Sequence, residues 1–296
     1  MLAVLLAGAP LFAACGSSGA GAGGGGDRPI VRLGTKNFTE QFVLGELYAQ
    51  ALRAAGFRVE IKDNIGSSEV VDRALVHDRI DLYPEYTGVI VRELAGERRR
   101  PRSAGETYER AKAFQARRGF ALLDMSPGFD RLANVVSMAA ARRHGLRTMP
   151  DLERLGRYRY GGFPENKVRF QGAVGVRRVY GLAFSFVPLP AGQHYEALDR
   201  GAVDVVDGGS TDAQLADPSR YRVLEDPKGI FGYQNIAPVV NRTVLADQGP
   251  DFARTLDAVT AKLTNGALQE MNGAVDLHGE RPADVATRFL REHALL

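Results

Sequence analysis

Tryptophan is absent from this sequence of 296 residues, and cysteine occurs only once, at Cys15. A single cysteine excludes an internal disulfide bond. The five histidines are scattered, and none belongs to a metal-binding pattern such as His-Glu-x-x-His. The sequence therefore predicts neither a metal site nor a cofactor.

The net charge is also small, because 38 basic side chains nearly balance 35 acidic ones and leave a net charge of +3. The densest basic run, "GERRRPRS" at 96–103, contains glycine and proline and follows an apolar stretch, so we interpret it as a solvated loop rather than a binding patch. Nucleic-acid-binding proteins usually present a concentrated basic surface. We therefore expect no nucleic acid among the partners.

A catalytic arrangement is missing as well. The stretch "GGSTD" at 208–212 follows an apolar strand, but Asp212 stands where the second glycine of a Gly-x-Ser-x-Gly nucleophile elbow would be. The remaining residues offer no pairing of a nucleophile with a base. We therefore do not expect an enzyme, and an extracytoplasmic hydrolase is the least favoured of the classes considered.

The apolar run at the N-terminus is too short to span a bilayer. Residues 1–15, "MLAVLLAGAPLFAAC", are typical of a lipoprotein signal peptide with Cys15 as the lipidated residue. Two details differ from the usual pattern: no Lys or Arg precedes the run, and Phe12 stands where leucine is usual. Residues 16–28 are rich in Gly and Ser and predict a flexible tether. We expect an extracytoplasmic, lipid-anchored protein; the alternative is a buried N-terminal segment with a chance cysteine.

Apolar periodicity predicts alternating strands and helices in the next sixty residues. Residues 29–35 alternate as a strand does. The helix that follows has one apolar face, made of Val43, Leu44, Leu47, Tyr48, Ala51 and Leu52. A second strand at 58–64, a helix at 66–79 with Ser67 or Ser68 as N-cap, and a third strand from Ile80 follow. This βαβαβ order predicts a parallel sheet.

The middle of the chain repeats this rhythm. Strand-like stretches at 131–140 and 158–163 alternate with helical ones, and residues 251–295 are helical by period with breaks near Asn265 and Gly279. The sequence therefore predicts an α/β fold with two lobes. Because ligands of open parallel sheets bind at the carboxyl ends of the strands, the loops of interest are 36–41, 64–68, 83–88 and 208–212.

Two of these loops suggest opposite ligand charges. In "KNFTEQ" we expect a capping box between Asn37 and Glu40, and Lys36 adds positive charge beside helix amides that favour anions. In "YPEYTG", Tyr83 and Tyr86 flank a carboxylate, as in sites that hold a cation by cation–π attraction. The simpler interpretations are a capped helix with an exposed lysine, and ordinary aromatic packing.

A third candidate pair lies in "ENKVR", where Glu165 and Arg169 are four residues apart. In a helix they would form a surface ion pair. If the segment lines a cleft, Arg169 could instead hold a ligand carboxylate in bidentate fashion. The spacing alone favours the surface pair.

Taken in order, these stretches resemble one family, the substrate-binding lipoproteins of ABC importers for compatible solutes such as glycine betaine, choline, carnitine and proline betaine. The similarity extends over about residues 30–295. Its signatures are "GTKNFTEQFVLGELYAQAL", "IDLYPEYTG", "YEALDRGAVDVVDGGSTDA", "VLEDPKGIFGYQNIAPVV", "MNGAVD" and "PADVATRFLRE".

The resemblance implies a two-lobed periplasmic-binding-protein type II fold, with 29–126 and 238–296 in lobe 1 and 127–237 in lobe 2. It implies a monomer that traps an osmolyte between the lobes and delivers it to a membrane permease driven by a cytoplasmic ATPase. In this family aromatic residues surround the ammonium head, and basic and polar groups hold the carboxylate. The predicted ligand-binding set, from these matches and the loops above, is Lys36, Gln41, Tyr83, Tyr86, Thr87, Asn134, Glu165, Arg169, Tyr195, Thr211, Asp212 and Gln234.

Two positions depart from the family's tyrosines. "LANVV" places Asn134 near one of them, and "GYQNIAP" places Gln234 at the other, with Tyr233 one position early. Amides make directional hydrogen bonds, whereas aromatic faces attract a quaternary ammonium. We therefore hypothesise a ligand more polar than trimethylammonium, such as an amino acid or a polyamine. The other alternative is an extracellular sensor or scaffold with the same fold.

Overall fold

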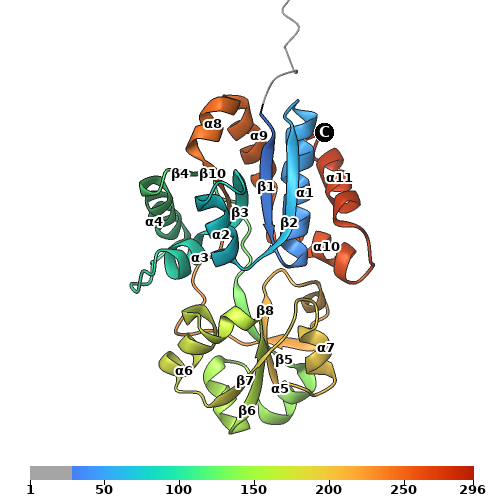
Figure 1. Ribbon diagram of the computed structural model, residues 1–296. Helices are drawn as coiled ribbons and strands as arrows, with labels where there is room; N and C mark the ends of the chain where they lie inside the picture. The colour runs from blue at the N-terminus through green and yellow to red at the C-terminus, as the bar shows by residue number, and fades with distance from the viewer. Residues whose placement is uncertain (1–28) are drawn as a thin grey trace, which may run out of the picture.

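Two mixed β-sheets, each of five strands, form the framework of the protein (Figure 1). The structure is a computed structural model that describes residues 29–296. The predicted signal peptide, the tether and the lipidation site Cys15 lie outside the described residues. Helices flank both sheets, which confirms the predicted α/β class.

The first sheet has the strand order β2-β1-β3-β10-β4. β1 pairs in parallel with β2 and β3, as the βαβαβ order predicted, whereas β10 is antiparallel to β3 and β4 and makes the sheet mixed. Every residue of β3 is buried, as expected for a strand covered on both faces. The strands are β1 (Val31–Lys36), β2 (Val59–Gly66), β3 (Leu82–Tyr86), β4 (Phe120–Leu122) and β10 (Ile236–Asn241).

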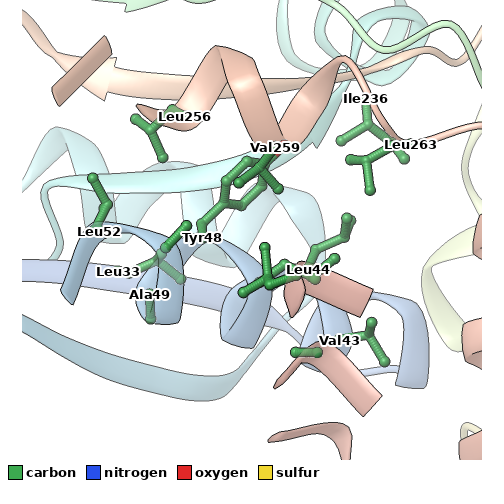
Figure 2. Close-up of a cluster of buried hydrophobic side chains, with 14 of the residues drawn as sticks. Leu33, Val43, Leu44, Tyr48, Ala49, Leu52, Ile236, Leu256, Val259 and Leu263 are labelled. Atoms are coloured by element: carbon green, nitrogen blue, oxygen red, sulfur yellow. The ribbon is translucent and has the colours of Figure 1, made fainter. Parts of the chain in front are cut away.

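One face of this sheet carries the N-terminal helix and three C-terminal helices. Figure 2 shows Leu44 and Tyr48 of the N-terminal helix beside Val259, in a cluster of buried side chains. The six apolar residues predicted to share one helical face are all buried, so the period of 3.6 identified this helix correctly. The four helices are α1 (Thr39–Ala54), α9 (Pro250–Thr260), α10 (Asn265–Asp276) and α11 (Pro282–Glu292).

The other face of the first sheet is covered by shorter elements. Val71 and Leu75 pack there with Tyr83 and Ile90 in a second buried cluster. Ser67 is the N-cap of the helix at this edge, as predicted. The elements of this part of the chain are α2 (Ser68–Val76), α3 (Thr87–Val89), the π-helical turn Ile90–Leu94 and α4 (Ala104–Arg117). The helix after β10, α8 (Arg242–Gln248), instead packs Val244 and Leu245 against the first cluster.

The second sheet has the strand order β7-β6-β8-β5-β9. β6 is parallel to β7 and β8, and β5 is antiparallel to β8 and β9. The strands are β5 (Leu132–Ser137), β6 (Tyr158–Gly162), β7 (Phe184–Pro188), β8 (Val205–Gly209) and β9 (Tyr221–Val223). The helices are α5 (Met138–His144), α6 (Gly175–Tyr180) and α7 (His194–Asp199), with short turns at Met149–Leu155, Pro164–Lys167, Phe170–Val174 and Ala213–Ala216.

The chain passes between the sheets twice, at 123–131 and at 224–235. The two crossings are hydrogen-bonded to each other. Asn235 Nδ2 donates to the carbonyl oxygens of Ser126 (3.0 Å) and Gly128 (3.2 Å), and the Asp130 amide donates to the Gln234 carbonyl (3.2 Å). Hydrogen bonds therefore hold the two crossings side by side. Among the helices of residues 29–296, none has the length and apolar character that a membrane span requires.

Candidate ligand-binding cleft

A cavity of about 470 Å³ lies where strand ends of the two sheets face each other. All four loops expected at the carboxyl ends of strands contribute to its walls, through residues of 36–40, 67–68, 86 and 208–212. The second sheet adds residues that follow β6 and the start of α7. The volume is within the range of pockets that enclose a small molecule.

Glu40 joins the two sides of this cavity. The predicted capping box is wrong: α1 begins at Thr39 after Phe38, and its N-cap makes no side-chain hydrogen bond. The Glu40 carboxylate instead accepts bonds from Tyr86 Oη (2.7 Å), Thr211 Oγ1 (2.6 Å) and Asn272 Nδ2 (3.1 Å). Thr211 follows β8 of the second sheet, so Glu40 bridges the cleft rather than capping its own helix.

Lys36, at the end of β1, is almost fully buried. Its Nζ lies 2.5 Å from Glu85 Oε1, and 3.9 Å from the centre of the Tyr86 ring. Burial lowers the pKa of Lys36, and the charge of Glu85 opposes that effect. The ammonium group is thus paired within the protein and occupies one face of Tyr86 by cation–π attraction.

Arg169 forms a second ion pair across the cleft. Its Nε and Nη2 donate to Glu69 at 2.9 and 2.6 Å, a bidentate contact between residues 100 positions apart. Burial favours the neutral carboxyl, but the hydrogen bonds and charge of Arg169 outweigh it and lower the pKa of Glu69 to about 2. The partner is therefore not Glu165, as the four-residue spacing suggested.

Asp212 and Asp130 form an acidic wall beside Glu40. Asp212 Oδ2 accepts from Tyr195 Oη (2.7 Å) and from the Gly209 amide (2.8 Å), yet burial raises the pKa of Asp212 to about 6. Burial, followed by the charges of Glu40 and Asp212, raises the pKa of Asp130 well above its ordinary value, although the neighbouring Thr211 opposes this shift. The nearby charge of Glu40 thus disfavours the ionisation of both Asp130 and Asp212.

Asp207, in β8, adds a further acid and is almost fully buried. Its Oδ2 accepts from the Phe163 amide (3.1 Å) and from Asn166 Nδ2. Its Oδ1 lies 3.1 Å from His194 Nε2, the distance of an ion pair. The carboxylate therefore holds the turn after β6 in place and faces the His194 ring with its other oxygen.

Aromatic side chains complete the walls. The rings of Phe38 and Tyr86 are nearly parallel with centres 6.4 Å apart, Phe163 lies 6.2 Å from Phe38, and His194 lies 4.5 Å from Phe163. Sequence reasoning missed Phe38, Phe163 and His194, as well as the acids Asp130 and Asp207. The only available signal was position: Phe38 and Phe163 lie just after strands, and Asp130 lies on a crossing, whereas Asp207 is within β8 and His194 begins α7.

A profile described as the substrate-binding domain of the ABC-type glycine betaine transport system matches residues 29–292. The chain belongs to this family. A glycine-betaine-binding protein of Pseudomonas aeruginosa is 30% identical over 281 residues, which are 90% of this chain and 88% of that protein. The glycine betaine-binding protein YehZ of Escherichia coli is 25% identical over 276 residues, covering 88% of this chain and 90% of the relative.

Solved structures agree with the fold. A structure described as a glycine betaine/carnitine/choline ABC transporter superposes with a TM-score of 0.72 at 23% identity, over 90% of this chain and 99% of the other. Apo YehZ from E. coli superposes with a TM-score of 0.65 at 25% identity, over 90% and 99% of the two chains. These matches confirm the predicted two-lobed binding-protein fold. The glycine betaine transport family consists of extracytoplasmic substrate-binding proteins rather than enzymes.

Eight of the twelve residues predicted to bind ligand line the cavity. They are Lys36, Tyr86, Glu165, Arg169, Tyr195, Thr211, Asp212 and Gln234. The amide of Gln234 is already engaged: Oε1 accepts from the Val89 amide (3.0 Å) and Nε2 donates to Gln171 Oε1 (2.9 Å). Gln234 thus shapes the wall through internal bonds.

Four predicted residues do not line the cavity. Tyr83 and Tyr86 are three positions apart in β3 and point to opposite faces, so Tyr83 packs among apolar residues of the second cluster beside Asp72. Gln41 is buried and donates to Tyr86 Oη (3.3 Å), so it supports the wall from behind. Thr87 is buried against the Tyr233 carbonyl, and Asn134 is buried within β5.

Proposed function

We propose that this chain is the solute-binding subunit of an ABC importer, and that it captures a small zwitterionic or quaternary-ammonium osmolyte of the glycine betaine and choline class. The observation that supports this most is the cavity between the two sheets, whose opposite walls are joined by the Glu40–Thr211 and Glu69–Arg169 contacts. A permease would receive the solute, and a cytoplasmic ATPase would drive its transport. Binding would favour closure because the solute contacts both walls, and a ligand shifts such an equilibrium only through contacts that differ between the open and closed forms.

The proposed binding residues are those of the predicted set that line the cavity, with Phe38, Glu40, Asp130 and Phe163 added. Lys36, Arg169 and the start of α2 line the cavity, and their basic and hydroxyl groups suit a carboxylate. The acids Asp130, Asp207 and Asp212 also line it, and they suit a positively charged head. This arrangement supports a solute with separated charges, like the glycine betaine for which the curated relatives are named.

The remaining features are proposed from the sequence pattern. Residues 29–126 and 238–296 would form lobe 1 and residues 127–237 lobe 2. The second boundary lies two residues inside β10, which begins at Ile236, so we place the crossing itself at 224–235. Lipidation at Cys15 with a tether at 16–28 would anchor the protein, as a monomer, at the outer side of the membrane.

Calorimetric titration with glycine betaine, choline, carnitine and proline betaine tests this function. A true ligand also raises the unfolding temperature, since a concentration of a hundred times its Kd adds about 2.7 kcal/mol of stability. Stimulation of the reconstituted permease and ATPase by the loaded protein would separate an importer subunit from a sensor. Failure of every small zwitterion and organic cation to bind would contradict the proposal.

A further inference from the structure

A second cavity, of about 200 Å³, has walls from both halves of the chain. One wall comes from the π-helical turn Ile90–Leu94 and the basic run 96–103, and the other comes from residues around Phe170 and Lys228. Gln171 lines this cavity and Gln234 lines the cleft, and their side chains are hydrogen-bonded at 2.9 Å. The two cavities are therefore neighbours, but no residue lines both of them.

The basic run 96–103 forms a fixed wall of this second cavity. The sequence indicated a solvated loop, yet two hydrogen bonds attach the run to the crossing at 224–235. Arg100 Nη1 donates to the Lys228 carbonyl (2.9 Å), and Tyr233 Oη donates to the Arg102 carbonyl (3.0 Å). The Arg100 guanidinium lies directly against Gly229, where a Cβ atom would come within 1.9 Å of Nη2. A glycine at 229 thus allows this close approach.

Positive charge dominates the walls. A single acid, Glu97, lines the cavity with five basic side chains, which are Arg92, Arg98, Arg99, Arg100 and Lys228. Glu97 is paired with Arg110 outside the cavity, and Arg99 is paired with Glu106. Among residues 29–296, no carboxylate lies within ion-pair distance of the other four basic groups. Arg92, Arg100 and Lys228 donate to backbone carbonyl oxygens instead.

Arg92 is the least exposed of these cations. Its guanidinium lies 3.6 Å from the centre of the Phe170 ring, and Nη1 donates to the Glu97 carbonyl (2.7 Å). Burial lowers the pKa of Arg92; the charge of Glu93 opposes this shift, and the charge of Arg98 adds to it. A partly desolvated cation beside a like charge is stabilised by a nearby anion.

We propose that this second cavity binds a small organic anion that carries a carboxylate or phosphate group. Arg92 and Arg98 would hold that group, because a guanidinium presents a planar fork of N–H donors that matches carboxylate and phosphate oxygens. Val91, Pro101 and Ile230 line the same cavity and suit a short carbon chain. The volume is below the range usual for drug-sized ligands, so the chain has only a few carbon atoms.

Matched charged and neutral compounds provide the test. We would titrate the purified full chain, at constant ionic strength, with succinate and succinamide, and with glycerol 3-phosphate and glycerol. We expect saturable one-to-one binding of at least one of the two anions with a Kd below about 1 mM, and no binding of the neutral compounds. Absence of saturable binding by both anions, or equal binding of their neutral counterparts, would overturn the inference.

Variants locate the bound anion. Arg92→Gln and Arg98→Gln should each weaken it about tenfold or more, because each removes a hydrogen bond between charged groups. Arg98 is exposed and has no ion-pair partner within residues 29–296, so Arg98→Gln should fold even if Arg92→Gln does not. Arg142→Gln is the matched control, because Arg142 is exposed in α5 and lines neither cavity. Thermal unfolding checks the fold of all three variants.

The outcomes also separate this site from the proposed solute site. Anion binding that Arg98→Gln leaves unchanged would place the anion elsewhere, for example beside Lys36 and Arg169 in the cleft, and would overturn the inference. An equal loss in Arg142→Gln would show diffuse attraction to surface charge and would overturn it as well. Titration with glycine betaine tests the cleft independently, so either proposal can fail while the other stands.

Discussion

The hydroxyl of Thr211 donates to Glu40 Oε2 at 2.6 Å, and so joins residues 171 positions apart on opposite walls of the cleft. Asn272 Nδ2 reaches the same carboxylate oxygen, and it also donates to the Thr211 carbonyl at 3.1 Å. Tyr86 supplies the third donor to this carboxylate. One carboxylate thus accepts hydrogen bonds from three separate parts of the chain.

Thr211→Val should weaken ligand binding about fivefold. The substitution keeps the side-chain shape but removes the hydroxyl, at a cost of about 1 kcal/mol for a hydrogen bond that exists only when the walls meet. Titration calorimetry measures the change. Thr243→Val is the matched control, because Thr243 is exposed in α8 and does not line the cavity. Equal affinities for wild type and Thr211→Val would show that this bond does not contribute to closure.

The Arg169–Glu69 pair should make closure sensitive to acid. The pKa of Glu69 is lowered to about 2, so its contribution to the closed form is complete above its ordinary pKa near 4.5 and is lost as the pH falls toward 2. Small-angle scattering of the ligand-free protein, as the pH falls from neutral toward that range, should therefore show expansion. Glu69→Gln should be expanded already at neutral pH and should respond less. If Glu69→Gln showed the same dependence of expansion on pH as the wild type, this ion pair would not be the cause.

Ligand binding should strengthen as the pH rises through about 6. Burial raises the pKa of Asp212 from 3.8 to about 6, with Glu40 adding to the rise and Tyr195, Gly209 and His194 opposing it. Because the folded pKa is the higher one, this group's contribution to the stability of the empty protein is present below pH 3.8 and is lost as the pH rises through 6. A bound cation offsets that cost, so the ligand-induced increase in unfolding temperature should grow with pH. Asp212→Asn should flatten both trends.

Two tyrosines should respond differently to loss of the hydroxyl. Tyr195→Phe leaves Asp212 without its 2.7 Å donor in the cavity wall, and we expect a loss of affinity of about fivefold, or about 1 kcal/mol. Tyr83→Phe removes only a 3.4 Å contact with Asp72 outside the cavity, and affinity should remain close to that of wild type. Parallel titrations compare the two variants. A larger effect at Tyr83 would contradict the placement of the cleft.

Local patterns predicted the elements of this fold well. The apolar face of α1 was identified correctly, and Ser67, one of the two serines expected at the N-cap of α2, stands there without a capping hydrogen bond from its side chain. Both features depend on residues within a few turns. Strand alternation also separates Tyr83 from Tyr86 once β3 is recognised, since residues three apart face opposite ways. The resemblance left Tyr83 or Tyr86 open, and the alternation of the strand decides for Tyr86.

Local sequence patterns could not identify side-chain contacts between residues that are far apart in the chain. Local spacing suggested Asn37 as a partner of Glu40, and Glu165 as a partner of Arg169. The structure instead pairs Glu40 with Thr211 and Arg169 with Glu69. In both cases the side chain contacts a partner across the cleft and not the expected neighbour in sequence, because buried charges need well-placed partners. Asp130 was missed for a related reason, since it lies on a crossing rather than in a strand or helix.

The two hydrogen-bonded crossings are the natural axis for a rotation of the lobes, and Asp130 lies on one of them. Such a rotation would move Asp130 little, whereas it would break and re-form the Glu40–Thr211 and Arg169–Glu69 contacts. A solute can thus meet the carboxylate of Asp130 in the open form and meet the other wall only afterwards. Recognition of charge would then come first, and enclosure second.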